Sequence, residues 1–449
     1  MTGIRSNMRT KIRYILAFTL TVLILFVLYL KGPKTPKPSY SKISEDTVVG
    51  YAFNNGEKRS GAAVAPINWK SHVRKSEKDR DKEVKETSKI SSKQNEQYHR
   101  DCKPKVNITL LKVHKTGSST LQNIFLRYGD KNNLNFAIPP IGHHLGYPQY
   151  FEKKHMIPVN GACNIYCHHS RFSSEVLDVM PPNSVYISIL RDPVPVFESA
   201  FTYFKMDGRA GMPGDPDAMT KFLQRPKHFY NKMRSKVHAR NVMLFDFGFP
   251  EEDFDDDSLI QKAIKMIEKQ FNLIVIAEYF DESLILLKEL LCFSLEDIAF
   301  FKMNSRKENS VHQLSDQLKK SIIDWNKGDV MLYEHFNRTL WQRIKAFGVE
   351  KMAAEVEQLR EINQKLFDKC IATDTGGQGD GKYRIFQPPG VKINTFVLKE
   401  SAKKDQLCEQ MVKPEISYTQ DLRRKQFPNF KSPQGMRHRQ RPPVKRKPF

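Results

Sequence analysis

A short apolar run that ends in a loop and leads into an amphipathic helix occurs three times in this chain. The runs cover residues 107–113, 185–190 and 273–277. The first leads into a helix that we expect to end at Gly129, and the second into an apolar helix that runs to Phe204. Alternation of apolar strands and helices is typical of a parallel sheet covered by helices. The sequence therefore predicts an α/β fold with a central parallel sheet flanked by helices.

The distribution of charge and apolar residues divides the chain into five parts. A run of 17 residues without charge, glycine or proline has the length of a single transmembrane helix. A cleaved signal peptide is the alternative, but the run ends in Leu-Tyr-Leu-Lys without a small-residue cleavage site, which favours an uncleaved signal-anchor. We expect a cytoplasmic tail, the anchor, a Lys/Glu/Ser-rich stem, a folded domain and a basic C-terminal tail, at residues 1–13, 14–30, 31–101, 102–421 and 422–449.

Two features place the folded domain in an oxidising lumen. The N-x-[ST] glycosylation sequons begin at Asn107 and Asn337, both after the anchor. The cysteines are even in number and also follow it. Disulfides form in such compartments, so a type II membrane topology is predicted. Six cysteines allow 15 pairings, among which the sequence does not choose; they are Cys102, Cys163, Cys167, Cys292, Cys370 and Cys408.

The net charge of +23 is concentrated at the two ends of the chain. Residues 1–37 carry seven basic residues and no acidic one, and residues 422–449 carry ten basic residues and no acidic one. The part between them is only mildly basic, so a broad nucleic-acid-binding face is not required and no nucleic-acid partner is expected. We interpret both ends as solvated tails.

The loop after the first apolar run has the composition of an anion site. A strand that turns sharply into a helix aims backbone N–H groups and the positive helix end at one point. A lysine adds a point charge and three hydroxyl groups add donors. The alternative is a plain turn, and the loop lacks the Walker A spacing of glycine, lysine and serine. The residues are Lys115, Thr116, Gly117, Ser118, Ser119 and Thr120.

A second candidate anion site follows the second apolar run. Arg191 ends the strand, and Ser199 lies eight residues further on, in the expected helix. A guanidinium can bind a phosphate with two hydrogen bonds, and the serine hydroxyl can share that phosphate. A surface turn between Arg191 and Asp192 is the alternative.

Together these segments resemble the Golgi galactose 3-O-sulfotransferase family, with glycan- or glycoprotein-directed members the nearer ones. The resemblance covers roughly residues 102–420. It implies a P-loop-like sulfotransferase fold, 3′-phosphoadenosine 5′-phosphosulfate as sulfuryl donor, a galactose-terminated glycan of a glycoprotein or glycolipid as acceptor, and a Golgi membrane location. The stretches that carry it are HKTGSST, CNIYCHHSRF, LRDP, EYFDESL, YEHFNRTLW and VKPEISY, which begin at His114, Cys163, Leu190, Glu278, Tyr333 and Val412.

The resemblance also assigns roles to individual residues. Lys115 matches the 5′-phosphosulfate lysine, with 116–120 as its loop, and Arg191 and Ser199 match the 3′-phosphate site. His114 and His169 match histidines with a proposed catalytic part. The family usually has asparagine where this chain has His168 and threonine where it has Val113, so which imidazole faces the reaction stays open.

These residue types suit transfer of a sulfuryl group to a sugar hydroxyl. A neutral imidazole can take the hydroxyl proton, and Lys115 can stabilise charge on the leaving phosphate. No metal is required by this chemistry, because cations and backbone donors already neutralise the phosphates.

Two other functions remain as alternatives. A Golgi glycosyltransferase that uses a nucleotide sugar and Mn²⁺ would employ the D-x-D spacing within residues 253–257, which otherwise caps a helix near Ser258. A membrane-tethered binder of acidic glycans would need no catalytic group. A homo-oligomer is compatible with either the enzyme or the binder.

Overall fold

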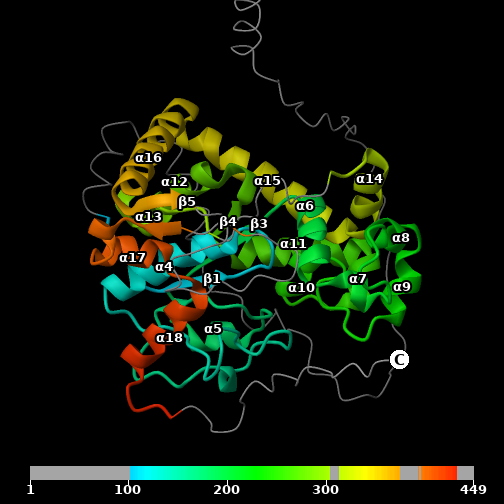
Figure 1. Ribbon diagram of the computed structural model, residues 1–449, viewed down its shortest axis with the longest axis horizontal. Helices are drawn as coiled ribbons and strands as arrows, with labels where there is room; N and C mark the ends of the chain where they lie inside the picture. The colour runs from blue at the N-terminus through cyan, green and yellow to red at the C-terminus, as the bar shows by residue number, and fades with distance from the viewer. Residues whose placement is uncertain (1–101, 304–312, 375–392, 394–395, 432–449) are drawn as a thin grey trace, which may run out of the picture. The chain divides into compact units, whose positions relative to one another are not determined.

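The computed structural model describes residues 102–303, 313–374, 393 and 396–431 (Figure 1). The predicted cytoplasmic tail, signal-anchor and stem lie outside these residues. Within the described part of the chain, no helix combines the length and the apolar character needed to cross a membrane. The described residues all belong to one compact unit, Ala65–Phe449.

A four-stranded parallel sheet forms the centre of this unit. Its strand order is β2 (Ile165–Tyr166), β1 (Ile108–Leu111), β3 (Val185–Leu190) and β4 (Leu273–Ile276). Leu111 pairs with Ser188, and Leu190 pairs with Ile276. All four strands are buried, as expected of a parallel sheet covered on both faces. The three predicted strands and the parallel sheet are confirmed, whereas the two-residue strand β2 was not predicted.

Each predicted strand is followed by the predicted helix. These are α4 (Ser118–Lys131), α6 (Pro193–Tyr203) and α12 (Phe280–Leu291). The prediction that the first helix ends at Gly129 is wrong, because α4 continues to Lys131. A Cβ at Gly129 would lie 2.3 Å from the Phe136 ring. The glycine therefore permits close packing and does not end the helix.

The remaining elements surround this sheet. Helices α12 and α15 pack on β4, and α17 and α18 pack on α4 (Figure 1). Among the described residues, short 3-10 helices cover Lys153–His155, Glu251–Asp255, Ala277–Tyr279 and Glu400–Ala402. The other helices and strands are α5 (Glu175–Val179), α7 (Met206–Arg209), α8 (Ala218–Gln224), α9 (Pro226–Lys232), α10 (Val242–Asp246), α11 (Asp257–Gln270), α13 (Leu295–Ile298), α14 (Asp316–Trp325), α15 (Lys327–Phe347), α16 (Val349–Cys370), β5 (Ile371–Asp374), β6 (Phe396–Leu398), α17 (Gln406–Val412) and α18 (Glu415–Gln426).

The acidic run that could have belonged to a glycosyltransferase caps a helix. The Asp256 side chain accepts hydrogen bonds from the backbone N–H groups of Ser258 and Leu259 at the start of α11. This is the N-cap interpretation of the run.

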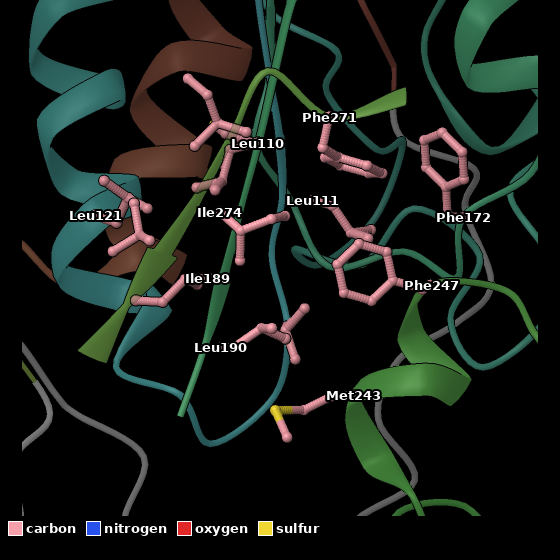
Figure 2. Packing of buried hydrophobic residues seen from close by; sticks show 14 of the residues in the cluster. Leu110, Leu111, Leu121, Phe172, Ile189, Leu190, Met243, Phe247, Phe271 and Ile274 are labelled. Atoms are coloured by element: carbon pink, nitrogen blue, oxygen red, sulfur yellow. The ribbon is translucent and has the colours of Figure 1, made fainter. Parts of the chain in front are cut away.

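The core lies where the sheet meets the helices that cover it. Figure 2 shows Leu110, Leu111 and Ile189 from the strands in the same cluster as Phe247 and Phe271. The two phenylalanine rings meet edge to face, with their centroids 5.1 Å apart. This arrangement fixes the strands, and with them the strand ends from which the candidate site is built.

Two disulfides and two free thiols account for the six cysteines. Cys102 is bonded to Cys292, and Cys370 to Cys408, whereas Cys163 and Cys167 are buried and free. Burial raises the pKa of the Cys163 thiol to about 12. The even number of cysteines therefore does not mean that all six are paired.

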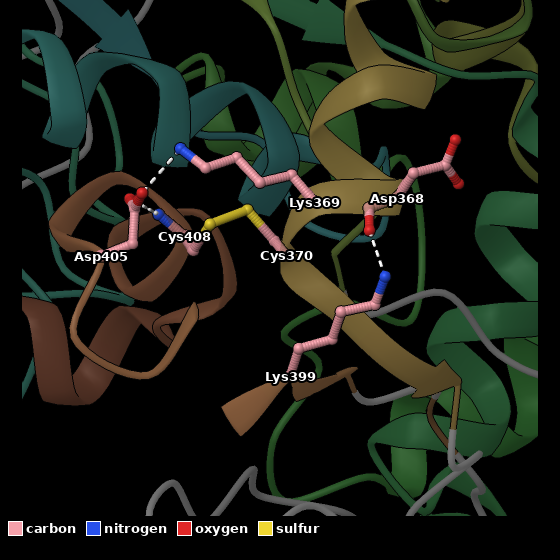
Figure 3. Close-up of a disulfide and its surroundings, with 6 residues drawn as sticks. All are labelled: Asp368, Lys369, Cys370, Lys399, Asp405 and Cys408. Carbon is pink, nitrogen blue, oxygen red and sulfur yellow. Dashed lines mark hydrogen bonds and ion pairs between the residues drawn. A yellow bond between two sulfur atoms is a disulfide. The ribbon is translucent and has the colours of Figure 1, made fainter. Parts of the chain in front are cut away.

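The Cys370–Cys408 disulfide joins the end of α16 to α17 (Figure 3). Lys369 forms an ion pair with Asp405 at 2.6 Å beside it, and Asp405 also accepts a hydrogen bond from the backbone N–H of Cys408. Strands β5 and β6, which pair antiparallel, pack in the same small cluster. The disulfide thus attaches the segment that leads into α18.

Candidate active site

The candidate residues gather at the carboxyl ends of the parallel strands, where open α/β sheets commonly bind ligands. Lys115 and its loop follow β1, His169 follows β2, and Arg191 follows β3. The guanidinium of Arg191 donates a hydrogen bond to the backbone carbonyl of Lys115 at 3.3 Å. The structure therefore brings together the two loops that the sequence singled out separately.

The loop after β1 has two left-handed residues. Lys115 has a φ of 61° and Gly117 a φ of 82°. Such a turn at the start of a helix directs successive backbone N–H groups into one concavity, which favours an anion. The hydroxyls of Thr116 and Ser118 both donate to the Val113 carbonyl, at 3.0 and 2.7 Å. These two hydroxyls therefore brace the turn.

The remaining predicted donor-site residues lie around this loop. The Thr120 hydroxyl accepts a hydrogen bond from the backbone N–H of Met303, and Ser119 is half-buried at the start of α4. The Lys115 ammonium lies 3.6 Å from the ring centroid of Tyr203 on α6. Ser199, on the same helix, is buried.

Glu278, which follows β4, is bonded through both carboxylate oxygens. One oxygen accepts from the backbone N–H of Asp192 at 3.0 Å and the other from the Tyr333 hydroxyl at 3.2 Å. Burial raises the pKa of Glu278. This carboxylate links the turn after β3 to helix α15.

His114 is held by a carboxylate from α10. Its Nδ1 and its backbone nitrogen both lie 2.8 Å from Oδ2 of Asp246. A carboxylate only accepts, so Nδ1 carries the hydrogen and Nε2 carries a lone pair. No described residue forms a hydrogen bond with this Nε2. The His114 side chain is 8% exposed, and that of Asp246 is fully buried.

His169 lies against His114, with the two rings stacked 3.9 Å apart. Its Nδ1 lies 2.9 Å from the carbonyl oxygen of Lys112, to which it donates, and its Nε2 lies 2.9 Å from the ammonium of the same lysine, from which it accepts. Burial and the neighbouring positive groups hold the pKa of His169 well below its ordinary value. Both ring nitrogens are therefore occupied, and the ring is neutral.

Lys112 belongs to a buried polar network that reaches the C-terminal helix. Its ammonium, 1% exposed, forms a 2.6 Å ion pair with Glu415 at the start of α18. Gln122 donates to the other Glu415 oxygen at 2.9 Å. Burial opposes ionisation of Glu415, but the Lys112 ammonium and the nearby imidazoles of His168 and His143 together hold the pKa of this carboxyl well below its ordinary value. His168 contacts Gln122 and Glu415 within this network.

Further aromatic side chains lie against His114, among them Tyr147, Phe204 and His238. The Tyr147 hydroxyl lies 2.9 Å from Nε2 of His238, and the His238 ring stacks on Phe204. Burial holds the pKa of His238 well below its ordinary value and lowers that of His144 to about 3. The imidazoles beside His114 are thus neutral.

Three residues of this site did not emerge from the sequence. Lys112 and Asp246 are single charges within apolar runs, LLKV and MLFDF. A charge in a buried run requires a partner, and that is the signal that could have identified them. Glu415 lies in the VKPEISY stretch that carries part of the family resemblance, but its partner is 303 residues away, so spacing could not connect them.

Both predicted sequons lie in or next to regular structure. The Asn107 amide bonds Asn183 and Asn164 at the start of β1, where Thr109 is fully buried. Asn337 lies in the middle of α15. Glycosylation at these positions stays a prediction. Among the described residues, no group of three or more His, Cys, Asp or Glu side chains is placed to hold a metal ion.

Comparison with known proteins gives one family. The model of the family described as galactose-3-O-sulfotransferase matches residues 8–426. Galactosylceramide sulfotransferase of Bos taurus is 40% identical over 72% of this chain and 79% of its own. Galactose-3-O-sulfotransferases 2 and 4 of Homo sapiens are 38% and 31% identical, over 72% and 73% of this chain and 85% and 84% of their own. Overall identity therefore gives no support for the expected greater likeness to glycan-directed members.

Proposed function

Since this chain belongs to the galactose-3-O-sulfotransferase family and is a galactose sulfotransferase, we propose that it sulfates the 3-hydroxyl of a β-galactose. The donor is 3′-phosphoadenosine 5′-phosphosulfate, and the acceptor is a galactose-terminated glycan of a glycolipid or glycoprotein. We further propose that a signal-anchor at residues 14–30 holds the enzyme in the Golgi membrane, with its folded domain in the lumen.

The left-handed turn before α4 supports the donor assignment. Lys115 and Gly117 both have positive φ, a conformation that gathers backbone N–H groups around an anion. Lys115 would hold the 5′-phosphosulfate end, and Arg191 and Ser199 the 3′-phosphate. The hydrogen bond from Arg191 to the Lys115 carbonyl keeps these two binding elements together. The donor supplies the sulfuryl group, and the chain supplies the charge that stabilises its leaving phosphate.

The observation that carries the base assignment is the His114–Asp246 hydrogen bond. It places the hydrogen on Nδ1 and leaves the lone pair of Nε2 available to accept a proton. His169 has neither nitrogen available, because Lys112 occupies both. We therefore assign the general base to His114, and to His169 the part of a neutral ring packed against it.

The reaction balances with these groups. The galactose oxygen forms a bond to sulfur while the bond between sulfur and the phosphate oxygen breaks. The hydroxyl proton passes to Nε2 of His114, and adenosine 3′,5′-bisphosphate leaves with the bonding electrons. The imidazolium then returns its proton to solvent.

The test is a transfer assay with the full-length protein in detergent. Labelled donor is offered with β-galactosides, half of them blocked at the 3-hydroxyl, in the presence of a chelator. We expect label only on acceptors with a free 3-hydroxyl, and at least about a 10²-fold loss of kcat in His114→Ala. Label on the blocked acceptors would refute the 3-hydroxyl assignment. Binding of acidic glycans without any turnover would support the binder alternative.

A further inference from the structure

Asp246 is a buried carboxylate that the donor and acceptor assignments leave without a role. One of its oxygens accepts from both Nδ1 and the backbone N–H of His114. The other, Oδ1, has no hydrogen-bond partner among the described residues. The Tyr147 hydroxyl, which lies 2.9 Å from Nε2 of His238, is also close enough to Asp246 for this carboxylate to help raise its pKa, after burial. A buried charge that serves folding alone is normally fully bonded, so this arrangement calls for another explanation.

Helix α10, which carries Asp246, is fixed by a polar clamp from the start of α15. The two carboxylate oxygens of Asp329 accept from the backbone N–H groups of Leu244 and Met243, at 2.9 and 3.0 Å. Asn326 accepts from the Asn241 N–H, and Asn241 accepts from the Asp329 N–H. Every hydrogen bond of this clamp uses a backbone N–H of α10, of α15 or of Asn241, which caps α10. The position of Asp246 is thus set independently of His114.

The two helices also approach closely. A Cβ at Gly328 would lie 2.6 Å from a methyl carbon of Leu244. At the other end of α10, the backbone carbonyl of Asp246 accepts a hydrogen bond from the N–H of Phe172. Phe172 follows His169 closely in the chain. A helix of five residues has little stability of its own. These contacts therefore hold α10 as a rigid platform for one side chain.

We propose that Asp246 is the positioning residue for the general base: it fixes the His114 tautomer with Nε2 bare, and its negative charge stabilises the imidazolium that forms during transfer. The inference rests on the proposed function of His114. The proton moves from the sugar oxygen to Nε2, the Nδ1 hydrogen stays on Nδ1, and Asp246 remains ionised throughout.

The other groups around His114 cannot supply this charge. His169, His238 and His144 are neutral, because burial lowers the pKa of each. Burial raises the pKa of the Tyr147 hydroxyl, which is neutral too. On the far side of His169, Lys112 is paired with Glu415, and Lys115 lies over the Tyr203 ring. Asp246 is the negative charge in direct contact with the imidazole.

Asp246→Asn tests the charge with little change of shape. The backbone N–H of His114 also points at the contacted oxygen, so the amide oxygen, and not its NH₂ group, is favoured there. The tautomer is then kept and only the charge is lost. We expect kcat to fall about 10- to 100-fold, with the donor KM within about twofold. The acid limb of the pH profile of kcat should move to lower pH by about one unit or more, because an imidazole without the neighbouring carboxylate protonates less readily.

Asp329→Asn is the matched control, since it replaces a buried carboxyl group of the same platform without touching His114. We expect it to lower the unfolding temperature and to leave the acid limb in place. The proposal is overturned if Asp246→Asn leaves the acid limb of the pH profile in place and loses activity only in proportion to its loss of folded protein, as the control does. Such a result would show a merely structural role. An Asp246→Asn enzyme with wild-type kcat would also overturn the proposal.

A second variant covers a failure of Asp246→Asn to fold. Asp246→Glu keeps the charge, so we expect the acid limb of the pH profile of kcat to stay in place; a limb that moves to lower pH, as expected of Asp246→Asn, would overturn the proposal. His114→Ala distinguishes a failure of the base assignment from a failure of the role proposed for Asp246. If it keeps wild-type kcat, the base assignment itself fails. If it is inactive while Asp246→Asn is normal in kcat and profile, the role of Asp246 alone fails.

Discussion

A histidine follows each of the strands β1 and β2, and the two rings stack 3.9 Å apart, yet their ring nitrogens are hydrogen-bonded differently. Among the residues that the structure describes, the Asp246 carboxylate is the hydrogen-bond partner of the His114 ring, and none bonds its Nε2. His169 has both nitrogens occupied by Lys112. Two identical side chains at one site thus differ in their hydrogen-bond partners. The partner, and not the residue type or its place in a motif, decides which ring can accept a proton.

The largest expected effect tests this difference directly. His114→Ala should lower kcat by about 10²–10⁴-fold, the usual contribution of a general base. His169→Ala should act mainly on stability, since it removes one hydrogen bond from a buried ammonium, a loss of about 1–3 kcal/mol. The measurements are kcat with saturating donor and the free energy of unfolding in urea. Equal losses of kcat in two folded variants would break the comparison.

The next effect concerns the network behind His169. Glu415→Gln leaves the Lys112 ammonium, 1% exposed, without its counter-ion. Removing one partner of a buried ion pair costs about 3–5 kcal/mol. The double variant Lys112→Met with Glu415→Gln should lose less stability than the sum of the single variants, because no uncompensated charge remains. Additive losses in urea unfolding would show that the two groups do not interact.

The disulfide that holds this side of the site has a somewhat smaller expected effect. Cys370 and Cys408 are 38 residues apart in the sequence, and replacing both by serine should cost about 2–4 kcal/mol. Because the bond attaches the segment leading to Glu415, the loss should fall on the His169 side and leave the Asp246 contact intact. Thiol labelling of the unfolded, non-reduced protein should find Cys163 and Cys167 alone. Labelling of four or more thiols would contradict the pairing.

The smallest effect concerns the support of the His114 side. Burial raises the pKa of Asp329 from 3.8 to about 7, although two backbone N–H groups oppose the shift. A raised carboxyl pKa adds stability that is fully present below the unfolded value and is lost as the pH rises through about 7. The slope is at most about 1.4 kcal/mol per pH unit. Asp329→Asn should make the free energy of unfolding less dependent on pH between pH 5 and 8 than it is in the parent protein. An unchanged pH dependence would show that Asp329 is not its source.

The sequence predicts the sheet and the loops well because those signals are local. The apolar runs, the turn at Lys115 and Gly117, and Arg191 at a strand end all lie within a few residues of the helices they introduce. The short strand β2 was missed, because two residues give no periodicity. Gly129 was misinterpreted, because a glycine that ends a helix and one that admits a ring look alike in sequence.

The polar partners could not be predicted for a different reason. Asp246 reaches His114 from 132 residues away, and Glu415 reaches Lys112 from 303 residues away. Neither of these acidic residues lies in a sequence motif that indicates its partner. Only the folded chain shows that one histidine has a carboxylate behind it and the other a lysine.

The reach of Glu415 has a consequence for how the enzyme is made. Lys112 leaves the ribosome long before the carboxylate that neutralises it, and at about 5–20 residues per second the delay for 303 residues is roughly 15–60 s. During that time the ammonium cannot be enclosed beside β1 without an unpaired buried charge. Final closure around the stacked histidines must therefore follow translation of α18. A nascent chain released before Glu415 would hold a sheet but no finished catalytic centre.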